Sequence, residues 1–552
     1  MSPIRFFLYG VPAILLLLLT VSFWNTKELS AKKKNEISLG LNAEPATLNP
    51  LQQPDTASGP VMALLYNGLL KQNENLELVG DLAQEWSISN TKTEPIIKFT
   101  LRRDVRWHDG TSFTSRDVLF TYHAIMDERL VSPLRGDFEK ILTIETPDPW
   151  HVIVRYRVPF SPALLSWTTA ILPAHLLEGT NPISWAGSFN RHPIGTGPFR
   201  FNEWKSNEYV RLQRNEDYFS GAPWLDSMVF HIFPDPLTMR LAFETNQIDF
   251  WDTPPSAIKS FSNRPDYELF DSPSNLYNYI GWNLRHKMFS DRSVRQALAQ
   301  AVNIPEMIRY ILYGHGVVST GIYTPQLWFF NPNVVPFPYN PEEAKKLLDA
   351  AGWKVGPDGI RQHHGKCFSF TIITNNGNDV RKDIATLVQD DLKKIGIEVK
   401  IEIYEWAVCL KKVKAGDFDA TALGWALPNN YDQYQVWHSS QCHPDEINYV
   451  GYQNPRADAL LLQLEQEYDH TKIIQLAGEL QQIIYQDQPY LFLFVPQSTS
   501  VLRRGSYRIC YPTDHGFVDS PIRMTKAGWS YNLEWFYRTE YPPIVIQKSD
   551  QK

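Results

Sequence analysis

Two short groups of side chains have the residue types that catalysis or metal binding needs. His108 and Asp109 could form the orienting half of a Ser-His-Asp triad, but neighbours in a hairpin rarely aim at one nucleophile, and the sequence has no Gly-x-Ser-x-Gly elbow. His438, Cys442 and His443 offer imidazole and thiol ligands, but a metal site needs a fourth convergent group at a spacing that sets the geometry. We therefore predict a turn at the first group, a loop at the second, and neither a catalytic residue, a metal nor a cofactor.

A glycine-rich segment, Pro193–Pro198, matches no nucleotide-binding pattern. The dinucleotide spacing fails because Arg200 stands where the third glycine belongs. Proline fixes φ and glycine permits unusual backbone angles, so the segment is predicted to make a sharply shaped crossing between two units. P-loop, His-Glu-x-x-His and EF-hand patterns are absent from the sequence. No motif supports an enzyme, although a peptidase with an unrecognised site stays an alternative.

The composition is that of a large globular chain. At roughly 150 residues per domain, 552 residues suggest three or four domain-sized units. Apolar residues make up 43% and charged residues 20%, which excludes disorder, collagen and a polytopic membrane protein. Lys and Arg total 53 against 60 Asp and Glu, and this net charge of −7 argues against a nucleic-acid partner.

The N-terminal segment, residues 1–35, is predicted to enter a membrane. Between Arg5 and Lys27 lies an uncharged run, Phe6–Trp24, which as a helix would span ~28 Å, about one bilayer core. The run is longer than the apolar stretch of a usual signal peptide, so an uncleaved anchor is favoured, with a cleaved signal as the alternative. A lipid-modified cysteine is excluded, because the first cysteine is Cys367.

The chain has four cysteines and no Cys-x-x-Cys pair, which makes zinc-ribbon or thioredoxin chemistry improbable. In an exported chain this even number allows one or two disulfides, in any of three full pairings. Four buried thiols are the other reading. The residues are Cys367, Cys409, Cys442 and Cys510.

Residues 36–190 have the pattern of an α+β unit. Ile97, Phe99 and Leu101 alternate with polar neighbours, as in a half-buried strand, and a second alternating run covers 152–158. Between these runs, Thr114 to Asp117 has the sequence of a capping box and predicts the start of a helix.

The C-terminal half has the pattern of an α/β unit. Apolar residues at helical spacing predict a helix over 294–302 after Asp291, and Asn340-Pro341 begins another that ends at Gly352. Alternating residues at 368–372 and 397–403 flank a helical pattern at 384–395. A strand, helix and strand of these lengths predict a parallel pair with a right-handed crossover.

Several longer segments occur in an order that identifies a family. They are Asp81–Trp86, Leu101–Thr111, Gly195–Phe199, Arg214–Phe219 with Gly221 and Leu225-Asp226, Val294–Leu298, Asn340–Ala344, Leu423–Trp425, Trp437–Gln441 and Gln488–Tyr490. Together they resemble the dipeptide- and oligopeptide-binding proteins of ABC importers, the family 5 extracellular solute-binding proteins. The resemblance covers nearly everything from about Ile37 to Glu540.

The resemblance implies a mixed α/β and α+β fold of the two-lobed, class II periplasmic-binding-protein type. Domain I would comprise 37–65, 192–282 and 499–540, an inserted domain II would comprise 66–191, and the second lobe, domain III, would comprise 283–498. Two strands would cross between the lobes, near Gly281 to Leu284 and near Val495 to Ser498.

The resemblance also implies a ligand site between the lobes. An acid two residues beyond the family's Gly-Trp-x commonly holds the peptide ammonium, but here that position is Pro428, and the closest acid is Asp432. We expect the second-lobe wall to contain Trp425, Asn429, Asn430 and Asp432, with Asp432 as the charge partner. The opposite wall is expected to contain Thr56, Ala57, Ser58, Trp251, Asp252 and Tyr279.

The function implied is that of a monomeric, extracytoplasmic receptor held at the membrane. It would capture a peptide or peptide-like solute by lobe closure and deliver it to an ABC permease, without doing chemistry. An anchored sensor or scaffold that feeds no permease is the other alternative.

Overall fold

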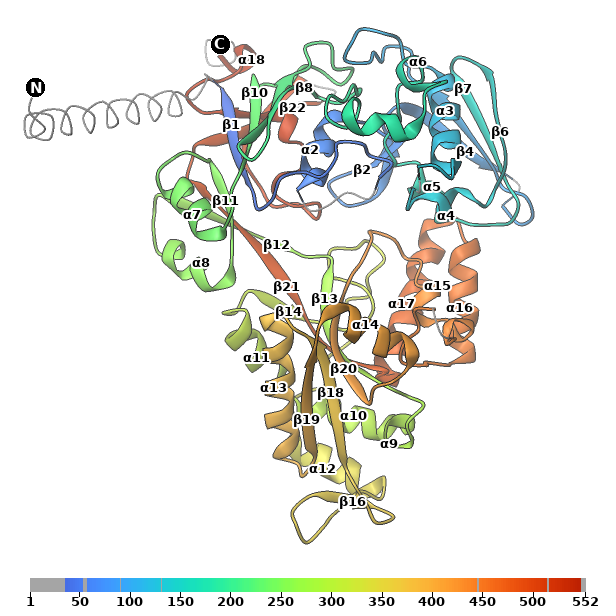
Figure 1. Ribbon diagram of the computed structural model, residues 1–552, viewed down its shortest axis with the longest axis vertical. Coiled ribbons are helices and arrows are strands. Elements are labelled where there is room, and N and C mark those ends of the chain that lie inside the picture. Colours follow the sequence, from blue (N-terminus) through green and yellow to red (C-terminus); the bar gives the residue numbers. More distant parts are fainter. Residues whose placement is uncertain are drawn as a thin grey trace, which may run out of the picture.

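Two lobes lie one above the other in Figure 1, joined near the middle of the molecule. This computed structural model describes residues 35–52, 57–89, 91–130, 132–443, 446–513 and 516–547. The predicted anchor, including Phe6–Trp24, lies outside the described residues. Within the described part, no helix combines the length and the apolar character needed to cross a membrane.

The first lobe is built from both ends of the chain. Its four-stranded sheet has the order β1-β10-β9-β8, with β1 parallel to β10 and the other pairs antiparallel. A three-stranded sheet from the C-terminal part, β23-β22-β24, lies beside it, and the Tyr507 hydroxyl donates to the Glu36 carbonyl at 3.1 Å. The strands are β1 (Glu36–Leu41), β8 (Phe199–Lys205), β9 (Tyr209–Arg214), β10 (Ser227–Ile232), β22 (Tyr507–Thr513), β23 (Gly516–Pro521) and β24 (Phe536–Arg538).

A second part of the first lobe lies on the right in Figure 1 and contains the predicted α+β pattern. Its sheet has the order β4-β5-β7-β6, and the predicted strand alternation is confirmed, since Ile97, Phe99 and Leu101 are all buried. The predicted capping box is confirmed too, because Asp117 Oδ2 accepts from the Thr114 amide at 2.9 Å. The elements are α2 (Ser58–Leu65), β2 (Leu70–Gln72), β3 (Leu78–Gly80), β4 (Ala83–Ser89), β5 (Ile96–Leu101), α3 (Ser115–Met126), α4 (Arg135–Phe138), β6 (Ile141–Asp148), β7 (His151–Tyr156), α5 (Ala163–Ser166) and α6 (Ala174–Leu177).

The second lobe contains the predicted α/β unit. Strands β18 (Ser369–Asn375) and β19 (Glu398–Tyr404) are parallel and are connected by α13 (Asp379–Lys393). The two capped helices are also confirmed, as α10 (Arg292–Ala301) and α12 (Pro341–Ala350). Other elements of this lobe are α11 (Ile304–Ile311), β14 (Gly316–Val318), α14 (Trp406–Ala415), β20 (Ala420–Ala426), α15 (Tyr434–Trp437), α16 (Pro455–Gln466) and α17 (His470–Asp487).

One long strand, β21 (Tyr490–Arg503), belongs to both lobes. Its first half pairs with β13 (Leu276–Trp282) and β14, and its second half pairs with β11 (Phe250–Thr253) and β12 (Tyr267–Pro273). The chain also crosses where β12 passes into β13, whereas Gly281 is paired with Thr421 of β20 inside the second lobe. The predicted crossing at Val495 to Ser498 therefore coincides with the switch of partners on β21, and the other crossing lies earlier in the chain than predicted.

The lobes have separate interiors except at Leu76, a residue of the first lobe whose side chain joins a cluster of the second. One large cluster of buried apolar side chains fills the first lobe, two fill the second, and a small one lies under α7 (Pro236–Glu244) and α8 (Pro255–Ser262). Such an arrangement leaves the interface between the lobes open to a ligand. The division into three domains with the predicted boundaries stays a prediction.

Candidate functional site

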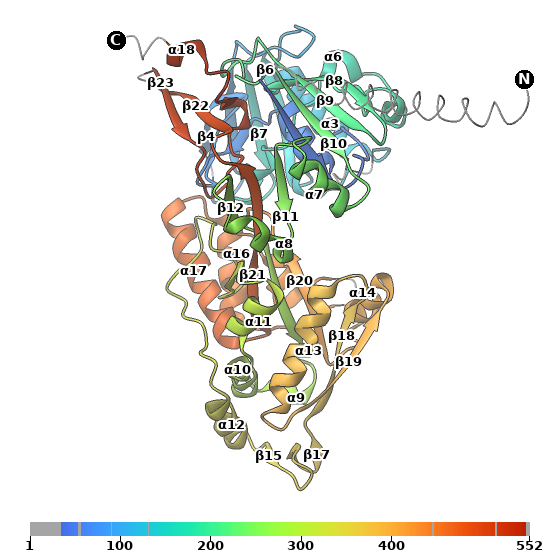
Figure 2. The same cartoon turned by 90° about the vertical axis from the view of Figure 1, so that its left-hand side faces the viewer.

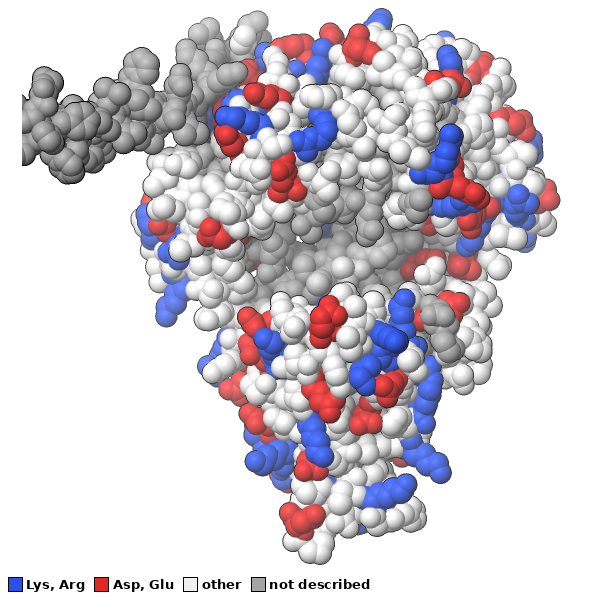
Figure 3. Space-filling model, viewed as in Figure 1, with Lys and Arg blue, Asp and Glu red and all other residues white. Residues whose placement is uncertain are grey.

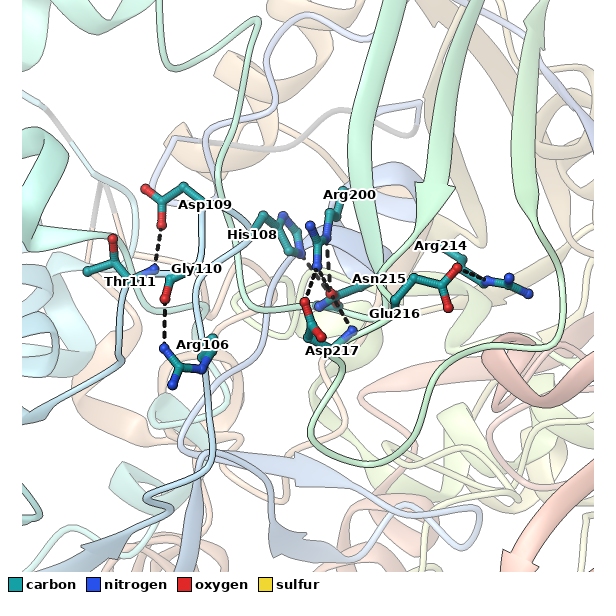
Figure 4. Close-up of polar contacts among 11 residues, drawn as sticks. Arg106, His108, Asp109, Gly110, Thr111, Arg200, Arg214, Asn215, Glu216 and Asp217 are labelled. Carbon is teal, nitrogen blue, oxygen red and sulfur yellow. Dashed lines mark hydrogen bonds and ion pairs between the residues drawn. The ribbon is translucent and has the colours of Figure 1, made fainter.

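In the first lobe, residues of the family signature contact one another and the glycine-rich segment Pro193–Pro198 through polar groups (Figure 4). The buried His108 ring lies against the glycine-rich segment, with Nε2 3.0 Å from the Gly197 carbonyl and Nδ1 accepting from the Gly195 amide at 3.1 Å. Burial lowers the pKa of His108 from 6.5 to about 4, so the ring is neutral at neutral pH. Asp109 instead contacts His175, at 2.7 Å. The predicted turn is thus confirmed, and His108 and Asp109 act on different partners.

The two glycines of this segment are required by close backbone contacts. A Cβ atom on Gly195 would lie 1.8 Å from the Leu65 carbonyl oxygen, and one on Gly197 would lie 2.4 Å from that of Leu64. No side chain fits at such distances, so α2 and the crossing segment can pack only when both positions are glycine. On the other side, Asn215 Nδ2 donates to the Gly197 carbonyl at 3.0 Å.

The candidate ligand site is the space between the lobes, where the space-filling view shows a hollow with few charged side chains on its visible walls (Figure 3). On the β21 side of this hollow is a cavity of about 340 Å³ that we call the polar cavity. Two predicted site residues, Asp252 and Asn429, line it together. Its other lining residues are Leu76, Ser272, Asn275, Ser498, Ser500, Lys526, Ala527, Gly528, Trp529 and Ser530.

Asp252 supplies a carboxylate to the polar cavity. Its Oδ1 accepts from the Ser500 hydroxyl at 2.5 Å, and β11 places it opposite Ser500 of β21. The side chain can be reached from the cavity, but the surrounding walls desolvate it and raise its pKa above the ordinary value, against the effect of the Ser500 hydrogen bond. No ion pair joins it to any residue in the described part of the chain. A cationic group in the cavity would therefore find an unused charge partner.

Side-chain amides bridge the lobes along this cavity. Gln326 donates to Asn275 Oδ1, Asn275 Nδ2 donates to Asn429 Oδ1 at 2.5 Å, and Asn429 Nδ2 donates to Gln72 Oε1 at 2.9 Å. Gln72 belongs to β2 of the first lobe, and Asn429 belongs to the loop 427–433 of the second. These amides can exchange hydrogen bonds with a peptide main chain, which presents the same donor and acceptor groups.

Trp425 lies in an aromatic wall of the second lobe. It is half-buried at the end of β20, its ring is stacked with that of Tyr449 at 6.0 Å, and its Nε1 donates to the Tyr490 hydroxyl at 3.2 Å. Tyr279 is only 2% exposed and lies behind Trp425, stacked on Tyr490 at 3.8 Å. Tyr279 is therefore not on the surface of the aromatic wall; it packs against Tyr490, which accepts the Trp425 hydrogen bond.

Asp432 lies in a different environment from Asn429. Its Oδ1 accepts from the Tyr434 amide at 2.9 Å, and its nearest charged groups are Lys140, Asp137 and Glu465. Burial is the main cause that raises the pKa of Asp432, and Lys140 opposes it. Asn430 lies in the same loop, where its Oδ1 accepts from the Asp432 amide at 3.0 Å, and it lines a cavity of about 360 Å³ between the lobes.

Of the remaining predicted site residues, those that the structure describes are buried and not on the cleft surface. Trp251 is 2% exposed and packs against Phe243 and Phe261 in the small core of the first lobe, which argues against the predicted contact with ligand. Ala57 and Ser58 are buried at the start of α2. Thr56 lies outside the described residues.

Arg381 is a partly buried charged residue of the second lobe that the sequence reasoning missed. It lies in the first turn of α13, just beyond the carboxyl end of β18, where ligands bind in open α/β sheets. Its Nη1 donates to Asn375 Oδ1 at 2.7 Å, but its buried Nε has no acceptor. Burial lowers the pKa of the guanidinium from its ordinary value. The sequence could have indicated Arg381, since an arginine beside a helix N-cap at the end of a strand can bind an anion.

The four cysteines are free thiols, so the disulfides that the sequence allowed are absent, and the alternative of four buried thiols is correct for only two of them. Cys409 and Cys510 are buried, Cys442 is partly buried and Cys367 is exposed. Among the described residues, no three His, Cys, Asp or Glu side chains converge in a way that could hold a metal ion. His438 lies in the predicted loop region after α15, where its ring stacks on Tyr434 at 4.2 Å.

The fold and the cleft define a two-lobed solute-binding protein. The family described as bacterial extracellular solute-binding proteins, family 5 Middle, matches residues 77–479. The oligopeptide-binding protein AppA of Bacillus subtilis (strain 168) is 36% identical over 475 residues, with 84% of this chain and 86% of AppA covered. The chain therefore belongs to family 5 of the bacterial extracellular solute-binding proteins.

Solved structures agree with this assignment. AppA from Bacillus subtilis in complex with a nonapeptide has a TM-score of 0.69 at 32% identity, covering 92% of this chain and 100% of AppA. NikZ from Campylobacter jejuni in complex with Ni(L-His) has a TM-score of 0.71 at 25% identity, with the same coverage. Structures of this fold thus hold ligands as different as a nonapeptide and a nickel complex of histidine.

Proposed function

We propose that this protein is a receptor that binds a peptide or peptide-like solute between its lobes and delivers it unchanged to an ABC permease. The oligopeptide-binding protein AppA, as its relative, supports the class of ligand. The separate interiors of the two lobes and the two strand crossings support closure as the mode of capture. The receptor works outside the cytoplasm as a monomer, with residues 6–24 as its membrane anchor.

The observation that carries the proposal is the carboxylate of Asp252, which forms no ion pair within the described part of the chain although Lys526 also lines the polar cavity. A free peptide has one ammonium group, and burying it between closing lobes is costly unless it meets an opposite charge. Asp252 provides that charge, and the amides of Asn275 and Asn429 provide partners for the adjacent main chain. Asp432, which we expected in this role, has Lys140 beside it.

The aromatic wall completes the second-lobe side of the site. Trp425 offers a flat face that stacks on side chains of many kinds. These contacts bind and orient; none of them activates a nucleophile, so the ligand leaves as it arrived.

The test is to incubate the full chain, held in lipid nanodiscs, with a pool of pentapeptides and to follow two quantities. Mass spectrometry of the retained fraction should recover intact peptides and no fragments. Small-angle scattering should give a smaller radius of gyration with the pool than without it. New cleavage products would support the peptidase alternative, and retention of no peptide would overturn the proposal. Reconstitution with candidate ABC permeases and a peptide-uptake assay then separates an importer from a sensor.

A further inference from the structure

We propose that a second cavity, next to the polar one, selects ligands that carry an apolar side chain of the aromatic or branched aliphatic kind. This inference rests on the proposed function and names a preference within it. The cavity has a volume of about 360 Å³, and we call it the apolar cavity. Its main apolar lining residues are Leu76, Leu78, Leu164, Leu165, Trp328 and Ile473.

The apolar cavity is made by both lobes. Leu78, Leu164 and Leu165 come from the inserted part of the first lobe, while Trp328 and Ile473 come from the second. In Figure 1 this is the place where α5 faces α16 and α17, and the turned view of Figure 2 also shows α16 and α17 below the first lobe. A group that fills the cavity therefore contacts both lobes at once and favours the closed arrangement over an open one.

Hydrogen bonds across the interface hold these walls together. The Ser161 amide donates to the Glu465 carbonyl at 2.6 Å, and its hydroxyl donates to the Leu464 carbonyl at 2.9 Å. The Tyr431 hydroxyl donates to Ser161 Oγ at 2.8 Å, and the Tyr468 hydroxyl accepts from the Phe160 amide at 3.2 Å. The cavity is thus a shaped space with satisfied polar groups at its edge, which is the form that ligand pockets take.

Leu76 connects the apolar cavity to the polar cavity. It lies at the turn between β2 and β3 with φ at +66°, a left-handed conformation that is unusual for a leucine. This turn carries the Leu76 side chain out of the first lobe and into a hydrophobic cluster of the second. Leu76 and Asn429 line both cavities. A ligand whose ammonium lies at Asp252 can therefore place a nearby side chain past Leu76 into the apolar cavity.

The chemistry of the walls indicates what this side chain is. The His470 ring stacks on Trp328 at 4.0 Å, and Tyr431 meets Trp328 edge-on at 6.2 Å, which leaves a flat aromatic surface. As far as the described residues form it, the lining contains no lysine or arginine to pair with a carboxylate, and its acidic residue, Glu77, already accepts a hydrogen bond from Asn73 Nδ2 at 3.1 Å. Polar lining groups such as Gln72 and Asn429 are already hydrogen-bonded to each other. An apolar side chain gains most from this space, because its burial needs no polar partner.

The experiment uses the full chain in nanodiscs and two pentapeptide pools with free termini. One pool contains only Gly, Ser, Asn and Gln, and the other has one Leu or Phe substituted at a random position. Both are offered at equal concentration, and mass spectrometry counts the retained peptides. We expect the wild type to retain the apolar pool at least about tenfold over the polar pool. Leu165→Trp, which fills the cavity, should bring this ratio close to one while polar peptides remain bound.

Two further variants keep the result interpretable. Leu78→Gln makes one wall polar without filling the space and should also lower the ratio. Leu142→Trp introduces the same ring on β6, where Leu142 is 41% exposed and outside the cavity lining, and should leave the ratio unchanged. A wild-type ratio near one overturns the inference, as does a ratio that folded Leu165→Trp or Leu78→Gln preserves. If the wild type retains neither pool, the peptide receptor itself is rejected and the inference falls with it.

Discussion

At the scale of single residues, the position of one charge decides how the cleft receives a ligand. Asp252 and Asp432 are both partly desolvated carboxylates, and Lys140 lowers the pKa of Asp432, whereas no ion pair joins Asp252 to Lys526 on the wall of the polar cavity. The sequence favoured Asp432 as the partner of the peptide ammonium, because it is the acid closest along the chain to Pro428, where the family commonly has an acid. The sequence could not indicate which way the loop 427–433 turns, and its turn carries Asp432 toward Lys140 and Glu465.

Asp252→Asn should weaken the binding of peptides with a free amine by about 30-fold or more, ~2 kcal/mol, because a desolvated ammonium loses its counter-charge. Binding of the same peptides after N-acetylation should change little. Isothermal titration with matched free and acetylated peptides measures both effects. Asp432→Asn is the matched control, and a larger selective loss in that variant would return the role to Asp432.

His108 should make the stability of the first lobe depend on pH. Its pKa is about 4 in the folded protein and 6.5 in the unfolded chain, so below pH 6.5 the unfolded chain binds more protons. Stability is therefore complete above pH 6.5 and is lost as the pH falls toward 4, by at most ~3 kcal/mol. Urea unfolding at pH 7 and pH 5 measures this difference.

His108→Gln should be less stable than the wild type at pH 7 and should lose this part of the pH dependence, because glutamine does not titrate. His192→Gln replaces a histidine of the same lobe with an exposed side chain and serves as the control. A pH dependence that survives in His108→Gln would assign the effect to another group.

At the scale of elements, the sequence predicted those whose signals are local. Asn340 and Asp291 cap helices where the pattern places them, and β18, α13 and β19 follow from strand and helix periodicity alone. The strand β21 could not be predicted in this way. Its two halves pair with strands that lie far away in the chain, as in the pairs Val318 with Phe494 and Phe270 with Ser500, and no local pattern records that partners change at Pro496 and Gln497.

The crossing segment allows a direct test of backbone packing. Gly195→Ala should destabilise the protein by ~3 kcal/mol or more, because its Cβ would meet the Leu65 carbonyl and neither backbone can move freely. Gly187→Ala is the control, since a Cβ there has nothing within 4 Å. Thermal unfolding compares the two. Equal, small shifts in both variants would show that α2 and the segment adjust without strain.

At the scale of the whole molecule, we expect a few hydrogen bonds between the lobes to set the equilibrium between the open and the closed form. Ser161→Ala removes the bond to Leu464 and the acceptor of Tyr431, and should weaken the contact by ~1–2 kcal/mol. The unliganded protein should then expand, and the apparent Kd for a bound peptide should rise about three- to tenfold.

Small-angle scattering and peptide titration measure these two consequences. Ser166→Ala is the matched control, because Ser166 is buried in α5 and makes no contact across the interface in the described structure. If Ser161→Ala leaves both the scattering curve and the titration unchanged, these bonds do not set the balance between open and closed forms.

The pairing of Tyr507 with Glu36 spans 471 residues, and Arg538 donates to the side chain of Asp249 from the end of the same C-terminal sheet. The first lobe is consequently incomplete until nearly the whole polypeptide has been synthesised. A nascent chain that has left the ribosome as far as the second lobe still lacks β22 and β24, so β1 stays without its C-terminal support. This favours translocation of the chain in an unfolded state, because β22 and β24 emerge last and complete the first lobe, which begins with β1.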